Sequence, residues 1–118
     1  MYVHDRNPAG TRIVGSPLYL SPETIRNRKL DHRSDMYSLG ATFFHLMAGT
    51  PPYSADSLRD LMLKHLREPV PSLRKRAPDA PDFLCAIVEK MMAKDPDERF
   101  ARYAEIVEGL DASADHSR

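Results

Sequence analysis

Residues 34–49, "SDMYSLGATFFHLMAG", carry apolar side chains all round the helical circle. A helix with this pattern is typically buried on every side. Asp31 or Ser34 could cap its N-terminus, and Gly49 followed by Pro51 is a strong stop signal at its C-terminus. The pattern therefore predicts that this helix is the central element of the fold.

Three further segments between prolines show helical periodicity. Residues 56–68, "DSLRDLMLKHLRE", place leucines, a methionine and His65 on one stripe, which predicts an amphipathic surface helix that ends before the next proline. Residues 79–94 carry a wide apolar stripe, with Asp79 as the expected N-cap. Residues 101–110 predict a last short helix. Since no segment alternates as a strand does, the predicted fold class is all-α.

Composition adds few constraints, because 17 basic residues balance 17 acidic residues in a chain of 118. We expect no nucleic-acid partner, because the balanced charges create no net electrostatic field that would attract one. We also expect no membrane segment, because no apolar run is long enough to cross a bilayer. The basic clusters at 26–29 and 74–76 are interpreted as solvated loop residues, with a binding patch as the alternative. The single cysteine, Cys85, excludes an internal disulfide. These features predict a cytoplasmic protein.

Four motifs follow one another along the chain: "GSPLYLSPE" at residues 15–23, then "SDMYSLG", "GTPPY" and "DPDERF". In the first of them, Ser21 suits an N-cap and Pro22 suits the first position of a short helix. In this order and with these gaps, the motifs resemble the C-terminal lobe of a bacterial eukaryotic-like (Hanks-type) serine/threonine protein kinase. The resemblance runs from near Thr11 to about Asp111.

The resemblance implies the domain organisation. Residues 1–14 would be part of an activation segment or an unrelated leader, and residues 15–111 would be the distal part of a kinase C-lobe. That lobe would contain the end of the activation segment and about four to five helices, as an incomplete domain. The tail at 112–118 is small and polar, which predicts disorder.

By the same resemblance, the loop that opens the first motif positions the peptide substrate. Ser16 stands where these kinases usually carry threonine, whose hydroxyl contacts the catalytic aspartate, and serine keeps that hydroxyl. Pro17, Leu18 and Tyr19 would shape the pocket for the residue that follows the phosphorylated one. A protein or peptide with a serine or threonine hydroxyl is the implied partner. For Pro17 an ordinary rigid turn is the alternative.

The kinase pattern also implies an ion pair between Glu23 and Arg99. A buried carboxylate without a partner is costly, and the planar guanidinium of arginine can satisfy both of its oxygens. The alternative is that Glu23 only complements a helix dipole while Arg99 is a solvated loop charge.

Two further residues have roles that the resemblance implies and the sequence leaves open. Asp35 corresponds to the aspartate on the central helix that anchors the catalytic loop, but without that partner it would only complement the helix dipole. Thr11 lies where such kinases are often activated by phosphorylation, and an unmodified loop threonine is the alternative.

Phosphoryl transfer requires a cradle for the ATP phosphates, a lysine, metal-binding carboxylates and an aspartate that orients the hydroxyl. The sequence contains no Gly-rich loop, no "VAIK"-like strand, no "HRD" and no "DFG". We therefore expect no catalytic, cofactor-binding or metal-binding residue in this chain, although the kinase family itself uses ATP and Mg²⁺. The chain alone is predicted to be inactive.

Two expectations follow from this missing machinery. The elements that would cover one side of the central helix are not found in the sequence, so an exposed apolar patch and self-association are predicted. The alternative function is a non-catalytic, kinase-derived binding module that uses the surface helix around Leu58–Leu66 to recruit a partner.

Overall fold

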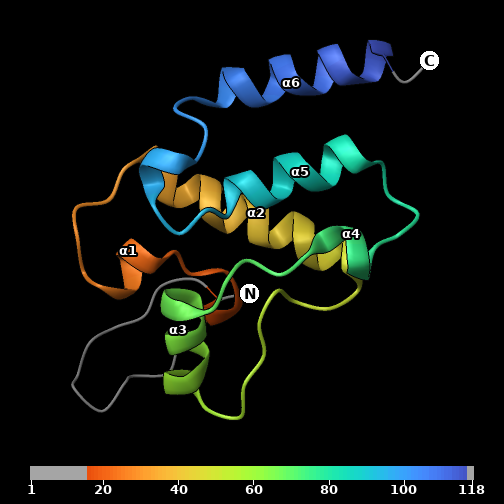
Figure 1. The fold of residues 1–118 in the computed structure, drawn as a ribbon. Helices are drawn as coiled ribbons and strands as arrows, with labels where there is room; N and C mark the ends of the chain where they lie inside the picture. The colour runs from red at the N-terminus through yellow and green to blue at the C-terminus, as the bar shows by residue number, and fades with distance from the viewer. Residues whose placement is uncertain (1–15, 117–118) are drawn as a thin grey trace.

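The computed structural model of the chain describes residues 16–116, which form helices, turns and loops with no strand in this range. The all-α fold class is therefore confirmed. The elements (Figure 1) are η1 (Pro17–Tyr19), α1 (Pro22–Ile25), α2 (His32–Ala48), α3 (Leu58–Arg67), α4 (Leu73–Arg76), α5 (Asp82–Met91), η2 (Pro96–Glu98) and α6 (Tyr103–His116).

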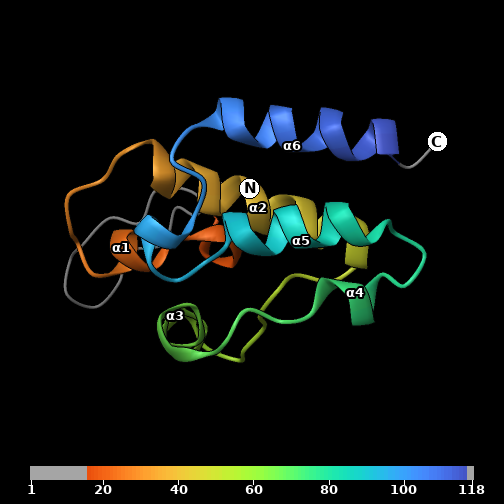
Figure 2. The same cartoon turned by 45° about the horizontal axis from the view of Figure 1, so that its top comes forward.

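Helix α2 is the central element, as the sequence predicts. Figures 1 and 2 show α2 and α5 side by side, with α6 beyond them on one side and α3 on the other. The carboxylate of Asp31 accepts a hydrogen bond from the backbone N–H of Arg33, so Asp31 is the N-cap. Gly49 ends the helix in the left-handed region, with φ 81°, where glycine carries no Cβ penalty.

The core lies where α2 faces α4 and α5. Its fully buried members include Tyr37, Phe44, Leu73, Cys85 and Val88. At Gly40 the helices approach so closely that a Cβ atom would lie 2.8 Å from the Cβ of Met91, closer than non-bonded carbons pack. The absence of a side chain at this position thus allows α2 and α5 to pack in direct contact.

One face of α2 is not covered by any described element. Leu39, Phe43 and Leu46 are 38%, 41% and 74% exposed. These positions are four and three residues apart, so the three side chains share one face of the helix. The exposed apolar patch that the sequence predicts is therefore confirmed, and burial on every side is wrong for this face.

The helices differ from the sequence prediction at several places: residues 74–76, interpreted as loop residues, belong to the short helix α4, and α5 ends at Met91, before the expected end at Lys94. Helix α5 has Pro81 as its N-cap residue and no side-chain cap, so Asp79 is not the cap. The residue before a proline is driven away from helical geometry, and this prevents the helix from starting at Ala80. Helix α6 continues to His116, beyond the end expected at Leu110 and into the tail predicted to be disordered. Alanine at 112 and 114 favours this continuation, because alanine has the highest helix propensity.

Candidate functional site

The site begins at the loop that contains Ser16, Pro17, Leu18 and Tyr19. Ser16 is buried and caps the short helix η1, with its Oγ accepting a hydrogen bond of 3.3 Å from the N–H of Leu18. Pro17 occupies the first helical position, where its missing N–H costs nothing. The side chains of Pro17, Leu18 and Tyr19 are half-buried. The four predicted residues therefore form one turn in which Ser16 is buried and the other three side chains are partly accessible.

Helices α2 and α3 fix this turn through its polar atoms. Ser38 on α2 donates its hydroxyl to the carbonyl of Tyr19 at 2.6 Å. The hydroxyl of Tyr19 lies 2.8 Å from Nδ1 of His45, also on α2. From α3, Nε2 of His65 lies 3.1 Å from the carbonyl of Pro17. The turn is thus held at both ends by helices that are remote in sequence.

The contacts of His65 define its protonation. Because a carbonyl only accepts hydrogen bonds, Nε2 must carry the proton that it donates to Pro17. Nδ1 then accepts from the hydroxyl of Tyr37 at 2.8 Å. Burial, together with the nearby charge of Lys94, lowers the pKa of His65 to about 4, so the imidazole is neutral near pH 7. Neutral His65 therefore connects the core to the turn.

Lys94 contacts His65 on α3 and belongs to the same group of hydrogen-bonded polar side chains. Its ammonium donates to the hydroxyl of Tyr53 and to the carbonyl of His65, both at 2.8 Å. Burial and the charge of Arg99 lower the pKa of Lys94 to about 8. The Tyr53 hydroxyl donates in turn to the carbonyl of Pro69, also at 2.8 Å. This cluster fixes the position of α3 and, through His65, that of the turn at Ser16–Tyr19.

The structure brings Glu23 and Arg99 together across the fold. Two nitrogens of the Arg99 guanidinium lie 2.6 and 2.9 Å from the two carboxylate oxygens of Glu23, in a two-pronged ion pair. Ser34 donates to the same carboxylate at 2.8 Å, and Arg99 also donates to the carbonyls of Arg33 and Ala93. Both charged groups are buried and satisfied.

The Glu23 carboxyl has a lowered pKa. Its burial alone would raise the pKa, but hydrogen bonds from Arg99, from its own backbone and from Ser34, with the positive charge of Arg99, outweigh that effect. This pair ties helix α1 to the segment after α5.

The remaining predicted residues lie outside this cluster. Asp35 is exposed in the first turn of α2, where its charge complements the helix dipole. Thr11 lies outside the described residues. Within residues 16–116, no group of three or more His, Cys, Asp or Glu side chains could hold a metal ion. None of the described helices is both long enough and apolar enough to span a bilayer.

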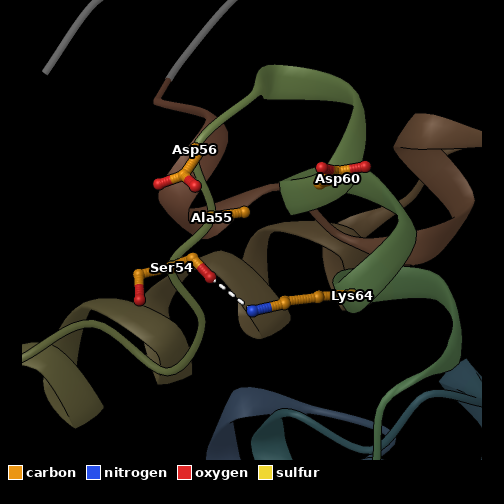
Figure 3. A pocket seen from close by; sticks show the side chains of 5 residues that line it. All are labelled: Ser54, Ala55, Asp56, Asp60 and Lys64. Atoms are coloured by element: carbon orange, nitrogen blue, oxygen red, sulfur yellow. Dashed lines mark hydrogen bonds between the residues drawn. The ribbon is translucent and has the colours of Figure 1, made fainter.

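A second concave region lies beside α3. Figure 3 shows the side chains that line this pocket, which come from α3 and the loop that precedes it. The pocket has a volume of about 550 Å³. Lys64 crosses it to donate to the carbonyl of Ser54 at 2.6 Å. Asp56 and Asp60 also line it and are exposed. The pocket is therefore polar and open.

Sequence reasoning missed His65, Tyr37 and Lys94 as parts of the site. The helical periodicity predicts that His65 lies on the apolar stripe of its helix, and its burial agrees with that position. A polar side chain within an apolar stripe is the available signal, because a buried imidazole needs two hydrogen-bond partners. Which partners it finds depends on segments that only the tertiary fold brings together.

Comparison with known proteins gives consistent matches. The family model described as "Protein kinase domain" matches residues 3–109. The chain is 42% identical over 95 residues to serine/threonine-protein kinase PknB of Mycolicibacterium smegmatis, a match that covers 80% of this chain and 15% of that protein. It is 36% identical over 86 residues to the DNA damage-responsive serine/threonine-protein kinase RqkA of Deinococcus radiodurans, covering 73% of this chain and 13% of that protein. With serine/threonine-protein kinase pkn3 of Myxococcus xanthus it shares 38% identity over 100 residues, which cover 80% of this chain and 18% of that protein. The chain thus spans less than a fifth of the length of these relatives.

Proposed function

The chain belongs to the protein kinase domain family, with bacterial Hanks-type serine/threonine kinases as relatives, and from this premise we propose that it supplies the peptide-positioning part of a serine/threonine kinase. The parent reaction would transfer the γ-phosphoryl group of Mg-ATP to a serine or threonine hydroxyl of a protein. The observation that carries the proposal is the turn at Ser16–Tyr19, which hydrogen bonds from α2 and α3 hold rigidly. A cytoplasmic location, where ATP is available, belongs to the same proposal.

Ser16 can combine its structural role with the role proposed for it in catalysis. Its Oγ accepts from the N–H of Leu18, and this leaves the hydroxyl hydrogen free to be donated to a carboxylate such as the catalytic aspartate of a whole kinase. Pro17, Leu18 and Tyr19 would contact the residue that follows the phosphorylated one. Asp35 would anchor the catalytic loop of that whole kinase, and Thr11 would be its phosphorylation site.

The described residues do not fit ATP or Mg²⁺, since they hold no metal-binding cluster and the sequence has no phosphate-cradling motif. We therefore propose that this chain binds substrate peptide but does not transfer phosphate by itself. Incubation of the purified chain with Mg-ATP and serine peptides should give no phosphopeptide above a reaction without protein. Phosphopeptide formed in proportion to the chain would contradict this proposal.

Exchanging Leu18 for charged residues should change which peptides bind. On an array of serine peptides that differ in the residue after the serine, Leu18→Glu should select basic residues there and Leu18→Lys should select acidic ones, because the new charge would face that residue. The two variants are matched controls, since both place a charge at the same half-buried position. An identical selection by both variants and the parent would contradict a substrate-contacting role for Leu18.

The outer face of α2 is proposed to bind a second copy of the chain. The three exposed apolar side chains lie on one face, and the net charge of +0 gives two copies no overall repulsion. Sedimentation velocity should show association of the parent and a shift to monomer for Phe43→Lys/Leu46→Lys. Val107→Lys on α6, which also replaces an exposed apolar residue, should leave association unchanged. Equal association of all three proteins would contradict this interface.

A partner-binding module without catalytic involvement is the second candidate function. The pocket beside α3 favours it, because Asp56 and Asp60 present exposed carboxylates that suit a cationic side chain of a partner. One measurement separates the two candidates. Binding of a partner at α3 would survive Leu18→Glu and be lost with Asp60→Lys, whereas binding of a substrate peptide at the turn would show the opposite pattern.

A further inference from the structure

The loop between α1 and α2 carries three cations that have no acidic partner within the described part of the chain, residues 16–116. Arg26, Arg28 and Lys29 are exposed, and the ion pairs found among residues 16–116 include none of them. Figure 1 shows this loop (orange) at one edge of the molecule. All three residues line a small cavity of about 170 Å³. We call this cavity and its three cations the basic corner.

The two carboxylates that also line the basic corner already have cationic partners. Glu23 is paired with the buried Arg99 at 2.6 Å, and Asp31 is paired at 2.9 Å with Arg33, which also contacts Asp97 at 2.6 Å. Neither can therefore compensate the three cations without giving up its own partner. The cavity keeps an excess of positive charge, which an anionic ligand would balance.

The backbone of the basic corner is fixed by a closed turn. Asn27 adopts the left-handed region, with φ 55°, a conformation that asparagine tolerates better than most residues. The N–H of Asn27 donates to the carbonyl of Thr24, and the N–H of Arg28 donates to the carbonyl of Glu23, which is the bonding pattern of a Schellman motif. Because the backbone that carries Arg26 and Arg28 is already ordered, little backbone entropy remains to be lost when a ligand binds.

We propose that the basic corner binds the phosphoryl group of a phosphoserine or phosphothreonine in a protein partner. Two guanidinium groups offer planar pairs of N–H donors that match the oxygens of a phosphate, and a lysine adds a compact charge. A phosphoryl group carries nearly two negative charges and three acceptor oxygens, so it engages three cations better than a single carboxylate does. A nucleic acid fits less well, because the cations occupy one small cavity and the chain has no net positive charge. This site is independent of the function proposed above, since it does not involve the turn at Ser16–Tyr19.

Fluorescence anisotropy with the full chain tests the proposal. The probes are a labelled peptide with one phosphoserine among uncharged residues and the same peptide with unmodified serine. The phosphopeptide should bind at least about tenfold more tightly, and added inorganic phosphate should displace it. Its affinity should fall as salt is raised, because the contacting charges are exposed. Equal binding of the two peptides would overturn the proposal.

Two variants with the same change in charge locate the site. The variant Arg26→Gln/Arg28→Gln/Lys29→Gln should lose at least about tenfold in phosphopeptide affinity. The variant Arg59→Gln/Arg67→Gln/Lys75→Gln removes three exposed cations from α3 and α4 and should bind as the parent does. If the first variant fails to fold by circular dichroism, the single substitution Lys29→Glu replaces it. An equal loss of phosphopeptide affinity in both variants would show that the overall charge of the chain attracts the peptide, and would overturn the proposed site.

A third probe separates partner classes. A labelled single-stranded oligonucleotide should bind more weakly than the phosphopeptide and should not compete with it at equal concentration. Preferential binding of the oligonucleotide, lost in the variant of the basic corner, would assign the site to nucleic acid and overturn the proposal of a phosphorylated protein partner.

Discussion

Glu23→Ala is expected to lower the free energy of unfolding by about 3–5 kcal/mol, the usual cost of leaving one partner of a buried ion pair uncompensated. Arg99 would keep a buried guanidinium while losing both of its contacts to the carboxylate. Ser34 would lose its acceptor as well. Urea denaturation followed by circular dichroism measures the change.

Controls separate this pair from ordinary surface charges. Asp97→Ala removes one of the two carboxylates paired with Arg33, at a side chain that is 82% exposed, and it should cost at most about 1 kcal/mol. The double variant Glu23→Leu/Arg99→Leu should be less destabilised than the sum of its single variants, because neither charge is then left alone. Equal losses from Glu23→Ala and Asp97→Ala would show that the pair at Glu23 contributes no more than a surface contact.

The same pair gives stability a defined dependence on pH. The pKa of Glu23 is lower in the folded chain than its ordinary value of 4.5. The unfolded chain therefore binds more protons in this range, and the contribution of the pair is lost as pH falls below that value. Glu23→Gln should abolish this part of the pH dependence, since glutamine does not titrate.

His65→Leu is the second substitution with a large expected effect. It would leave the carbonyl of Pro17 without its donor and the hydroxyl of Tyr37 without its acceptor, with only Lys94 at 3.5 Å from that hydroxyl, at about 1–3 kcal/mol for each unsatisfied group. It should also loosen the turn, so the amide of Tyr19, which is bonded to Ser16, should exchange its hydrogen faster. Urea denaturation and hydrogen exchange measure the two effects.

A matched variant tests whether the lost hydrogen bonds cause the effect. Tyr37→Phe/His65→Leu removes the unsatisfied hydroxyl and should recover part of the stability lost in His65→Leu. The folded pKa of His65, about 4, lies below its ordinary value of 6.5, so protonation favours the unfolded chain and stability falls as pH drops from about 6.5 to about 4. Unchanged exchange at Tyr19 in His65→Leu would contradict the role of His65 in holding the turn.

Rules for capping residues and prolines predicted the helix ends at which such residues occur. The caps of α2 at Asp31 and Gly49, and the end of α3 at Glu68 before Pro69, follow from residues that are adjacent in the chain. The capping rules gave the wrong N-cap for α5, because its N-cap residue is Pro81 and no side chain caps this helix. Helix boundaries without such punctuation depend on small differences in propensity that tertiary context overrides.

The site was less predictable than the fold for a physical reason. Periodicity shows which face of a helix is buried, but it does not show which polar groups meet there. Glu23 and Arg99 are separated by 76 positions. Only the resemblance to kinases predicts that they form an ion pair, because nothing in the local sequence of either residue indicates the other. His65 and Pro17 are 48 positions apart, and nothing in the local pattern of either residue indicates the other.

The buried thiol of Cys85 can report on the separation of α5 from the rest of the core. It is the only cysteine in the sequence, it is 1% exposed, and burial raises the pKa of its thiol. A thiol-specific reagent can therefore react only when α5 separates from α2 and α4, and no engineered label is needed. The labelling rate, divided by the rate for the unfolded chain, gives the equilibrium constant for that opening when reclosing is fast. Mass spectrometry of labelled samples could thus rank every variant above at concentrations where association through α2 is negligible.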